Sequence, residues 1–118
     1  MGLGDTVVIL GAGQRGLGAV IAAKSVGASK VIITGLEKDQ HKLALAQELG
    51  ADHAVVVDGP DAVDIVEFVG DVTHGAMADV AVELTPMAAG PVNDALRSVR
   101  HGGTVVLAGL KGGGRSPW

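Results

Sequence analysis

Three glycines near the N-terminus, Gly11, Gly13 and Gly16, have the spacing G-x-G-x-x-G. This spacing is typical of a turn that binds the pyrophosphate of a dinucleotide, provided that a strand precedes it and a helix follows. Here it follows the β-branched run TVVIL and leads into a stretch with helical periodicity. We expect Gly11 to allow the tight turn, Gly13 to let the pyrophosphate approach, and Gly16 to let the helix pack closely on the strand. Backbone N–H groups at the helix start favour the anionic ligand.

Gln14 and Arg15 stand between the second and third glycines and belong to the same predicted binding turn. The guanidinium of Arg15 is able to contact a phosphate through two parallel hydrogen bonds. The alternative is that Arg15 is an ordinary surface cation and that the whole motif is only a structural elbow. A chain with 19 glycines contains such matches by chance, so the surrounding elements must decide.

No other group of residues has a spacing that predicts catalysis or metal binding. The histidines do not share H-x-x-x-H spacing and the chain has no cysteine, so we predict neither catalytic nor metal-ligating residues. We interpret the histidines as surface or helix-end residues; they are His41, His53, His74 and His101. The acidic stretch at Asp58, Asp61 and Asp64 is interpreted as a helix cap with a solvated helix start.

The composition limits the class of protein. The chain has 118 residues, enough for one domain, and its formal charge of −4 argues against a nucleic-acid surface. No apolar run approaches the roughly 20 residues that span a bilayer, so no membrane partner is expected. The N-terminus lacks the charged and apolar regions of a signal peptide. Together with the absence of cysteine, this predicts a cytoplasmic protein.

Apolar runs alternate with stretches of helical periodicity along the chain. The runs predict strands at residues 6–10, 31–34, 54–57, 79–83 and 104–108. The periodic stretches predict four helices. These are residues 17–26, a helix capped by Asp39 and closed by Gly50, a helix capped by Asp61 and extending to Val72, and a helix that opens at Gly90-Pro91 and is closed by Gly102.

This alternation predicts an α/β fold, a doubly wound parallel sheet of the Rossmann type with helices on both faces. Right-handed crossovers give the expected strand order 3-2-1-4-5. Ligands of such sheets bind at the carboxyl ends of the strands, here between Gly11 and the pair Leu84-Thr85. We expect one dinucleotide-binding domain at residues 1–110 and a flexible tail at residues 111–118.

The order of these motifs resembles the coenzyme domain of the medium-chain, zinc-type alcohol and polyol dehydrogenases. The resemblance rests on GDTVVILGAGQRGLGAVIAAKSVGASKVIITG, KLALAQELGAD, AVEL and LRSVRHGGTVVLAGL. It implies that the chain binds NAD or NADP, and that Ala108 and Gly109 join the glycine turn, Leu84 and Thr85 as coenzyme-binding residues. It also implies that zinc is held by a catalytic domain that this chain lacks, so that the chain is a fragment without the sixth strand.

Two departures from the family pattern stand at the predicted site. Gln14-Arg15 replaces the frequent Pro-Val of the glycine turn, and strand 4 ends in ELTP where the family often has EATG. The family carries an acid at Glu83 as part of the fold, so we interpret this residue as structural.

The end of the second strand bears on the choice of coenzyme. An acidic residue about 20 positions after the glycine motif normally binds the ribose 2′-hydroxyl and selects NAD. The family spacing places Gly35 there, and Lys38, His41 or Lys42 would offer charge to a 2′-phosphate, which favours NADP. Glu37 supports the opposite choice, because it is able to bind a ribose diol.

Two functions remain open. The chain is either the NAD(P)-binding part of an alcohol or polyol dehydrogenase, inactive alone, or a free-standing NAD(P)-binding sensor or regulatory module without catalysis. A methyltransferase on a similar sheet fits the turn spacing less well. The uncharged edge strand at residues 104–108 predicts a homo-oligomer, since open edges pair with other chains.

Overall fold

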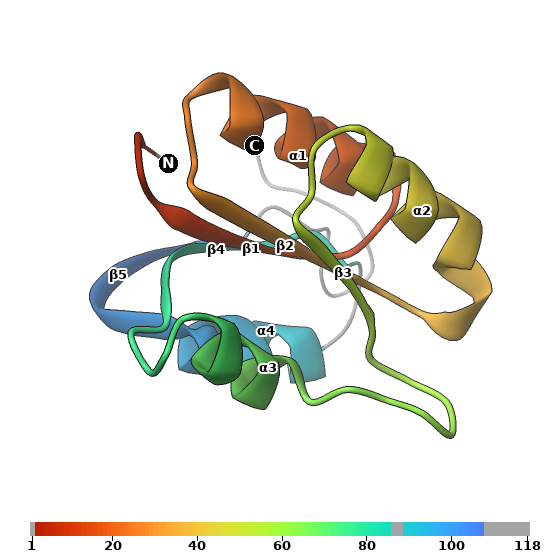
Figure 1. Ribbon diagram of the computed structural model, residues 1–118. Helices are drawn as coiled ribbons and strands as arrows, with labels where there is room; N and C mark the ends of the chain where they lie inside the picture. The colour runs from red at the N-terminus through yellow and green to blue at the C-terminus, as the bar shows by residue number, and fades with distance from the viewer. Residues whose placement is uncertain (1, 86–88, 108–118) are drawn as a thin grey trace, which may run out of the picture.

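The computed structural model describes residues 2–85 and 89–107, and these form one parallel sheet covered on both faces (Figure 1). The strand order is β3-β2-β1-β4-β5 and every neighbouring pair is parallel, which confirms the predicted order. The strands are β1 (Thr6–Leu10), β2 (Lys30–Gly35), β3 (His53–Val56), β4 (Ala78–Glu83) and β5 (Val99–Leu107).

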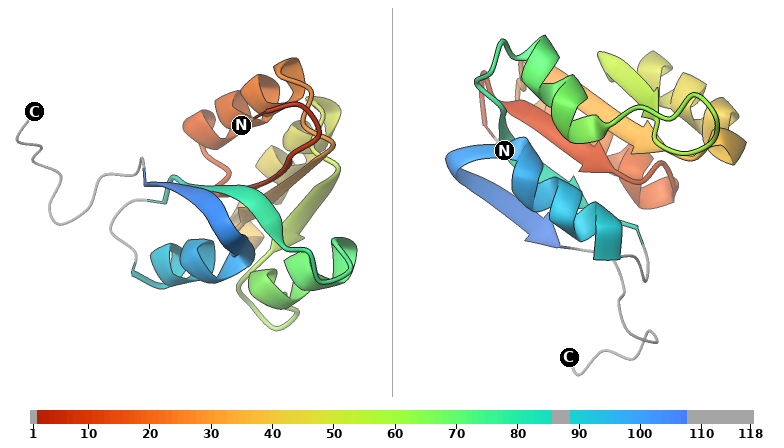
Figure 2. Two further views of the ribbon diagram at one scale, coloured as in Figure 1. Left: turned by 90° about the vertical axis from the view of Figure 1, so that its left-hand side faces the viewer. Right: turned by 90° about the horizontal axis from the view of Figure 1, so that it is seen from below.

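Helices lie on both faces of the sheet. In Figure 1, α1 (Gln14–Ser25) and α2 (Gln40–Glu48) lie above it, and α3 (Ile65–Val72) and α4 (Ala89–Ser98) lie below. A short 3₁₀ helix, η1 (Glu37–Asp39), joins β2 to α2. The views in Figure 2 show the same three layers from the side and from below. No helix in the described part of the chain is long and apolar enough to span a membrane.

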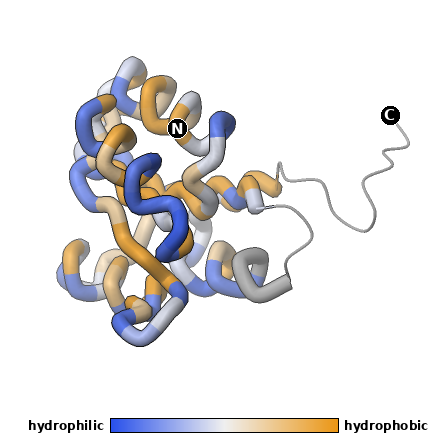
Figure 3. The backbone as a smooth tube through the Cα atoms, turned by 90° about the vertical axis from the view of Figure 1, so that its right-hand side faces the viewer, coloured by the Kyte–Doolittle hydropathy of each residue, from blue (hydrophilic) through white to orange (hydrophobic). Residues whose placement is uncertain are grey.

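Successive side chains of β1 point alternately into two separate apolar cores. Val7 and Ile9 pack in the core under α1 and α2, whereas Val8 and Leu10 pack in the core over α3 and α4. All four are at most 2% exposed, as expected for a central strand of a parallel sheet. In Figure 3, hydrophobic residues follow the strand that crosses the middle of the view and alternate with hydrophilic residues along the helices. The central strand is therefore fixed from both sides, and its carboxyl end presents the glycine turn.

The two predicted aspartate caps have different outcomes: Asp61 does not cap α3, whereas Asp39 is the N-cap residue of α2 but makes no side-chain capping bond. The cap of α3 is Asp64, whose carboxylate accepts hydrogen bonds from the N–H groups of Val66 (3.0 Å) and Glu67 (3.2 Å). Asp39 does precede α2, but its side chain makes no capping bond to that helix. Instead it turns back and accepts a hydrogen bond from the N–H of Leu36 at 3.1 Å. The path of each loop, which the sequence does not specify, decides which aspartate meets the free N–H groups.

The predicted boundary between the fourth helix and the fifth strand was also wrong. Helix α4 ends at Ser98, so Arg100 lies in β5, where its Nε donates to Asp79 Oδ1 at 2.7 Å. Asp79 Oδ2 also accepts from the N–H of Thr6. The Arg100 hydrogen bond, followed by that of Thr6, holds the pKa of Asp79 below its ordinary value of 3.8. Gly102, with φ of 79°, lies in an irregular part of β5 and does not close a helix.

Candidate coenzyme site

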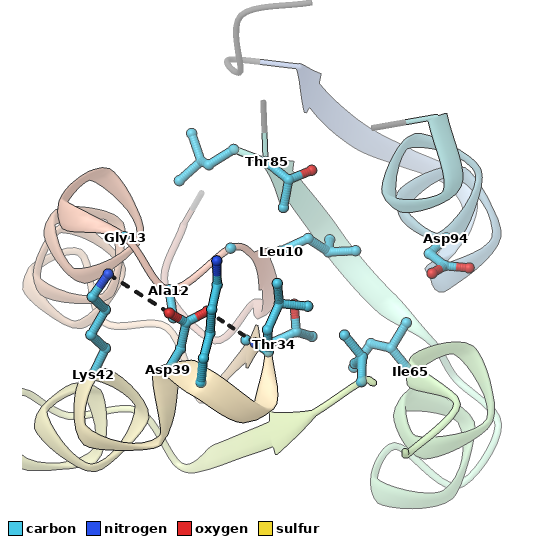
Figure 4. A pocket seen from close by; sticks show the side chains of 15 residues that line it. Leu10, Ala12, Gly13, Thr34, Asp39, Lys42, Ile65, Thr85 and Asp94 are labelled. Atoms are coloured by element: carbon cyan, nitrogen blue, oxygen red, sulfur yellow. Dashed lines mark hydrogen bonds and ion pairs between the residues drawn. The ribbon is translucent and has the colours of Figure 1, made fainter. Parts of the chain in front are cut away.

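A cavity of about 520 Å³ lies at the carboxyl ends of the strands, between the glycine turn and the end of β4 (Figure 4). It occupies the point where the chain passes to opposite sides of β1, which is where open parallel sheets bind ligands. The predicted residues that line it are Gly11, Gly13, Gly35, Lys38, Leu84 and Thr85. The structure therefore brings predicted residues from three separate segments together around one cavity.

The glycine turn has the backbone geometry that its spacing predicts. Gly11 has φ of 120°, a conformation that residues with a side chain rarely adopt. A Cβ on Gly16 would lie 1.9 Å from the carbonyl oxygen of Gly11, so α1 packs against the turn as closely as a glycine permits. A Cβ on Gly13, in contrast, would meet no atom within 4 Å. The space that a Cβ at Gly13 would occupy is therefore empty of protein atoms.

The N-terminus of α1 is arranged to receive an anion. Gly13 is the N-cap residue, no side chain caps the helix, and the first turn contains no acidic residue. A helix of 12 residues has a developed dipole, and its first N–H groups have no partner within the helix. Gln14 and Arg15 are exposed in this first turn and do not line the cavity. Gly16 is buried beneath them.

The cavity wall at the end of β2 contains several charged residues instead of a single acidic residue on the strand. Gly35 lines the cavity, but Glu37 does not. The charged residues that do line it here are Lys38, Asp39 and Lys42, and the Lys42 ammonium lies 3.7 Å from Asp39 Oδ1. Sequence reasoning treated Asp39 only as a helix cap. It lies four residues after β2, and the sequence alone did not show that η1 folds the chain back over the end of this strand.

The end of β4 is held by a buried carboxylate. Glu83 is 0% exposed, and its Oε2 accepts hydrogen bonds from the N–H of Thr85 (2.7 Å) and from the Thr85 hydroxyl. The N–H of Leu84 donates to the carbonyl of Leu10 at 2.9 Å, which continues the β1–β4 pairing to the cavity. Glu83 thus fixes the wall that Leu84 and Thr85 form, in agreement with its interpretation as structural.

Two predicted coenzyme-binding residues and the predicted tail fall outside the part of the chain that the structure describes. Ala108, Gly109 and the tail at residues 111–118 are outside the described residues. Within residues 2–85 and 89–107, no group of three His, Cys, Asp or Glu side chains is placed to hold a metal ion. Asp94 of α4 lines the cavity beside Ile65, and sequence reasoning missed it, because a helical aspartate carries no signal of a site.

Comparison with known proteins identifies the family. The model of the zinc-binding dehydrogenases matches residues 16–117. A probable alcohol dehydrogenase of Mycobacterium tuberculosis is 44% identical over 94% of this chain. D-arabitol-phosphate dehydrogenase of Enterococcus avium is 40% identical over 92% of it. The chain spans 29% of the length of each of these relatives.

Solved structures agree with the sequence comparison. An alcohol dehydrogenase from Thermus sp. ATN1 superposes with a TM-score of 0.82 at 29% identity, over 100% of this chain and 33% of its own. A zinc-binding dehydrogenase from Sinorhizobium meliloti 1021, solved bound to NADP, also has a TM-score of 0.82, at 36% identity, over 98% of this chain and 32% of its own. The family match, the strand order and the glycine turn agree, and the chain belongs to the zinc-binding dehydrogenase family.

Proposed function

We propose that this chain binds NAD(P) and is the coenzyme-binding part of an alcohol or polyol dehydrogenase. The observation that carries the proposal is the open face of Gly13 beside the uncapped N-terminus of α1, at the mouth of the strand-end cavity. The pyrophosphate would lie over Gly13, where the helix N–H groups and dipole favour its charge. The relatives with dehydrogenase names and the NADP-bound structure support this assignment.

The residues present fit a dinucleotide. The cavity has a volume of about 520 Å³, within the usual range for small-molecule sites. Its walls combine apolar side chains, such as Leu10, Val57 and Ile65, with charged groups at the end of β2. The bound coenzyme would supply hydride transfer, and this chain would bind and orient it. The described residues provide no ligand set for zinc, so we assign no zinc-dependent step to this chain.

We further propose a small preference for NADP over NAD. Gly35 places no carboxylate at the end of β2, and the ammonium groups of Lys38 and Lys42 line the cavity nearby. Calorimetric titration of the chain with NADH and with NADPH tests both proposals. We expect both to bind, with NADPH favoured by less than about tenfold, which is 1.4 kcal/mol. Absence of binding would overturn the proposed function, and a tenfold preference for NADH would overturn only the preference for NADP.

The chain alone is expected not to oxidise alcohols. Hydride transfer requires an alcohol held and polarised next to the nicotinamide, and we have assigned neither a metal site nor a catalytic residue to the described residues. The test measures NADH and NADPH formation spectrophotometrically with ethanol, sorbitol and butanediol at high protein concentration. Alcohol oxidation by the purified wild-type chain that is lost in a Gly13→Val variant would contradict this expectation.

We also propose that the chain associates through β5. In the described part of the chain this strand pairs only with β4, and Val106 and Leu107 are 42% and 55% exposed. An open apolar edge favours pairing with another chain. Light scattering over a concentration series should show association, which a Val106→Lys variant should reduce. A wild-type chain that stays monomeric at the highest concentration would exclude this mode of assembly.

A further inference from the structure

We propose that Asp39 and Lys42, and not the last residue of β2, discriminate between a ribose 2′-hydroxyl and a 2′-phosphate. This inference rests on the proposed function, because it concerns the adenosine end of the same cavity. Asp39 would accept a hydrogen bond from the free hydroxyl of NAD. Lys42 would neutralise the phosphate of NADP.

The last residue of β2 is a tightly packed glycine, so this position supplies no carboxylate. A Cβ on Gly35 would lie 3.0 Å from the Cβ of Ala12 and 3.1 Å from Cδ2 of Leu43. Ala12 belongs to the glycine turn and is 3% exposed, and Leu43 belongs to the core under α2. A side chain at position 35 would therefore push against both the turn and the core. The discriminating charge has to come from another residue.

Glu37 does not supply that charge. It does not line the cavity, and its N–H donates to Asp58 Oδ1 at 2.6 Å. Its carboxylate lies against Gly59, since a Cβ on that glycine would collide with Glu37 Oε2. The carboxylate of Glu37 is thus directed toward the loop after β3, away from the cavity wall.

Asp39 is held over the end of β2 by its own turn. Its N–H donates to the carbonyl of Leu36 at 2.8 Å, and its Oδ2 accepts from the N–H of Leu36 at 3.1 Å. The side chain is 17% exposed, so this carboxylate has a defined place in the cavity wall. Its other oxygen, Oδ1, lies 3.7 Å from the Lys42 ammonium (Figure 4). One carboxylate oxygen of Asp39 is thus held by a backbone N–H, and the other forms an ion pair with Lys42.

This pair responds differently to the two coenzymes. A ribose hydroxyl is a donor, and the carboxylate of Asp39 in the cavity wall is an acceptor. A 2′-phosphate is repelled by Asp39 and attracted by Lys42, which is 43% exposed and therefore able to move from the carboxylate to the phosphate. Lys38, also in the wall, adds a second positive charge. The pair accordingly admits both coenzymes and keeps the preference between them small.

The first test removes the negative charge of Asp39 and compares it with a neighbouring aspartate. Asp39→Asn keeps an acceptor for the Leu36 N–H, and Asp58→Asn keeps one for the Glu37 N–H while lying outside the cavity. Titrations with NADH and NADPH give the ratio of dissociation constants. We expect Asp39→Asn to shift this ratio about tenfold toward NADPH, or 1.4 kcal/mol. A shift no larger than that of Asp58→Asn would overturn the inference.

A second variant keeps the test decisive if Asp39→Asn does not fold. Lys42→Met preserves the aliphatic length of the side chain and should shift the ratio about tenfold toward NADH. Titration with 2′,5′-ADP and 5′-AMP isolates the adenosine end, and the shift should appear there as well. An unchanged ratio in Lys42→Met would contradict the inference. If the wild-type chain binds neither coenzyme, the proposed function itself fails, which is a different result from binding whose ratio does not change.

Discussion

A valine in place of Gly13 is expected to weaken the binding of both NADH and NADPH about a hundredfold or more, a loss of about 2.7 kcal/mol. The valine itself fits the protein, because a Cβ at this position meets no atom within 4 Å and the backbone, with φ of −74°, suits any residue. Its two methyl groups would occupy the space over the N-terminus of α1 where the pyrophosphate is proposed to lie. The measurement is calorimetric titration, with far-UV circular dichroism to establish that the fold is retained.

The matched control is Gly18→Val, on the exposed face of the same helix. A Cβ on Gly18 also meets no atom within 4 Å, but this residue does not line the cavity. The control variant should bind both coenzymes as the wild-type chain does. Equal affinities in wild-type and Gly13→Val proteins would show that the coenzyme does not lie over this turn.

Alanine in place of Gly16 is expected to destabilise the fold by about 3 kcal/mol or more, at the upper end of the range for overpacked sites. The added Cβ would lie 1.9 Å from the carbonyl oxygen of Gly11. The obstacle is backbone and not the end of a side chain, so either the turn or α1 must shift. The neighbouring core offers little space, since Ile33 is 0% exposed and its Cδ1 would lie 3.5 Å from the new atom. Urea denaturation followed by circular dichroism measures the free energy of unfolding.

Gly18→Ala serves as the control for this substitution, two residues further along α1. Its Cβ meets open space, and alanine favours a helix more than glycine does, so this variant should gain about 0.5–1 kcal/mol. The two variants should therefore change stability in opposite directions. A Gly16→Ala protein as stable as the wild type would mean that helix and turn are not packed as closely as the structure has them.

The sequence by itself determined the architecture and several of the residues that line the strand-end cavity. The alternation of β-branched runs with helical periodicity is a local pattern, and right-handed crossovers convert it into one strand order, which the structure confirms. The local sequence also predicts the strand–helix junction that contains Gly11, Gly13 and Gly16. Leu84 and Thr85 follow from the same strand order, because parallel strands end at one edge of the sheet.

The tertiary structure alone decided what depends on residues far apart in the chain. Helix α4 stops at Ser98 and Arg100 joins the sheet, where it meets Asp79, a partner 21 positions away. Asp64 caps α3 because of the path of the preceding loop. Asp39 reaches the cavity because η1 folds back on Leu36, and Ala12 and Leu43 pack tightly around Gly35. Hydrophobic periodicity specifies which elements form, whereas packing between distant segments fixes which charged side chain enters the cavity.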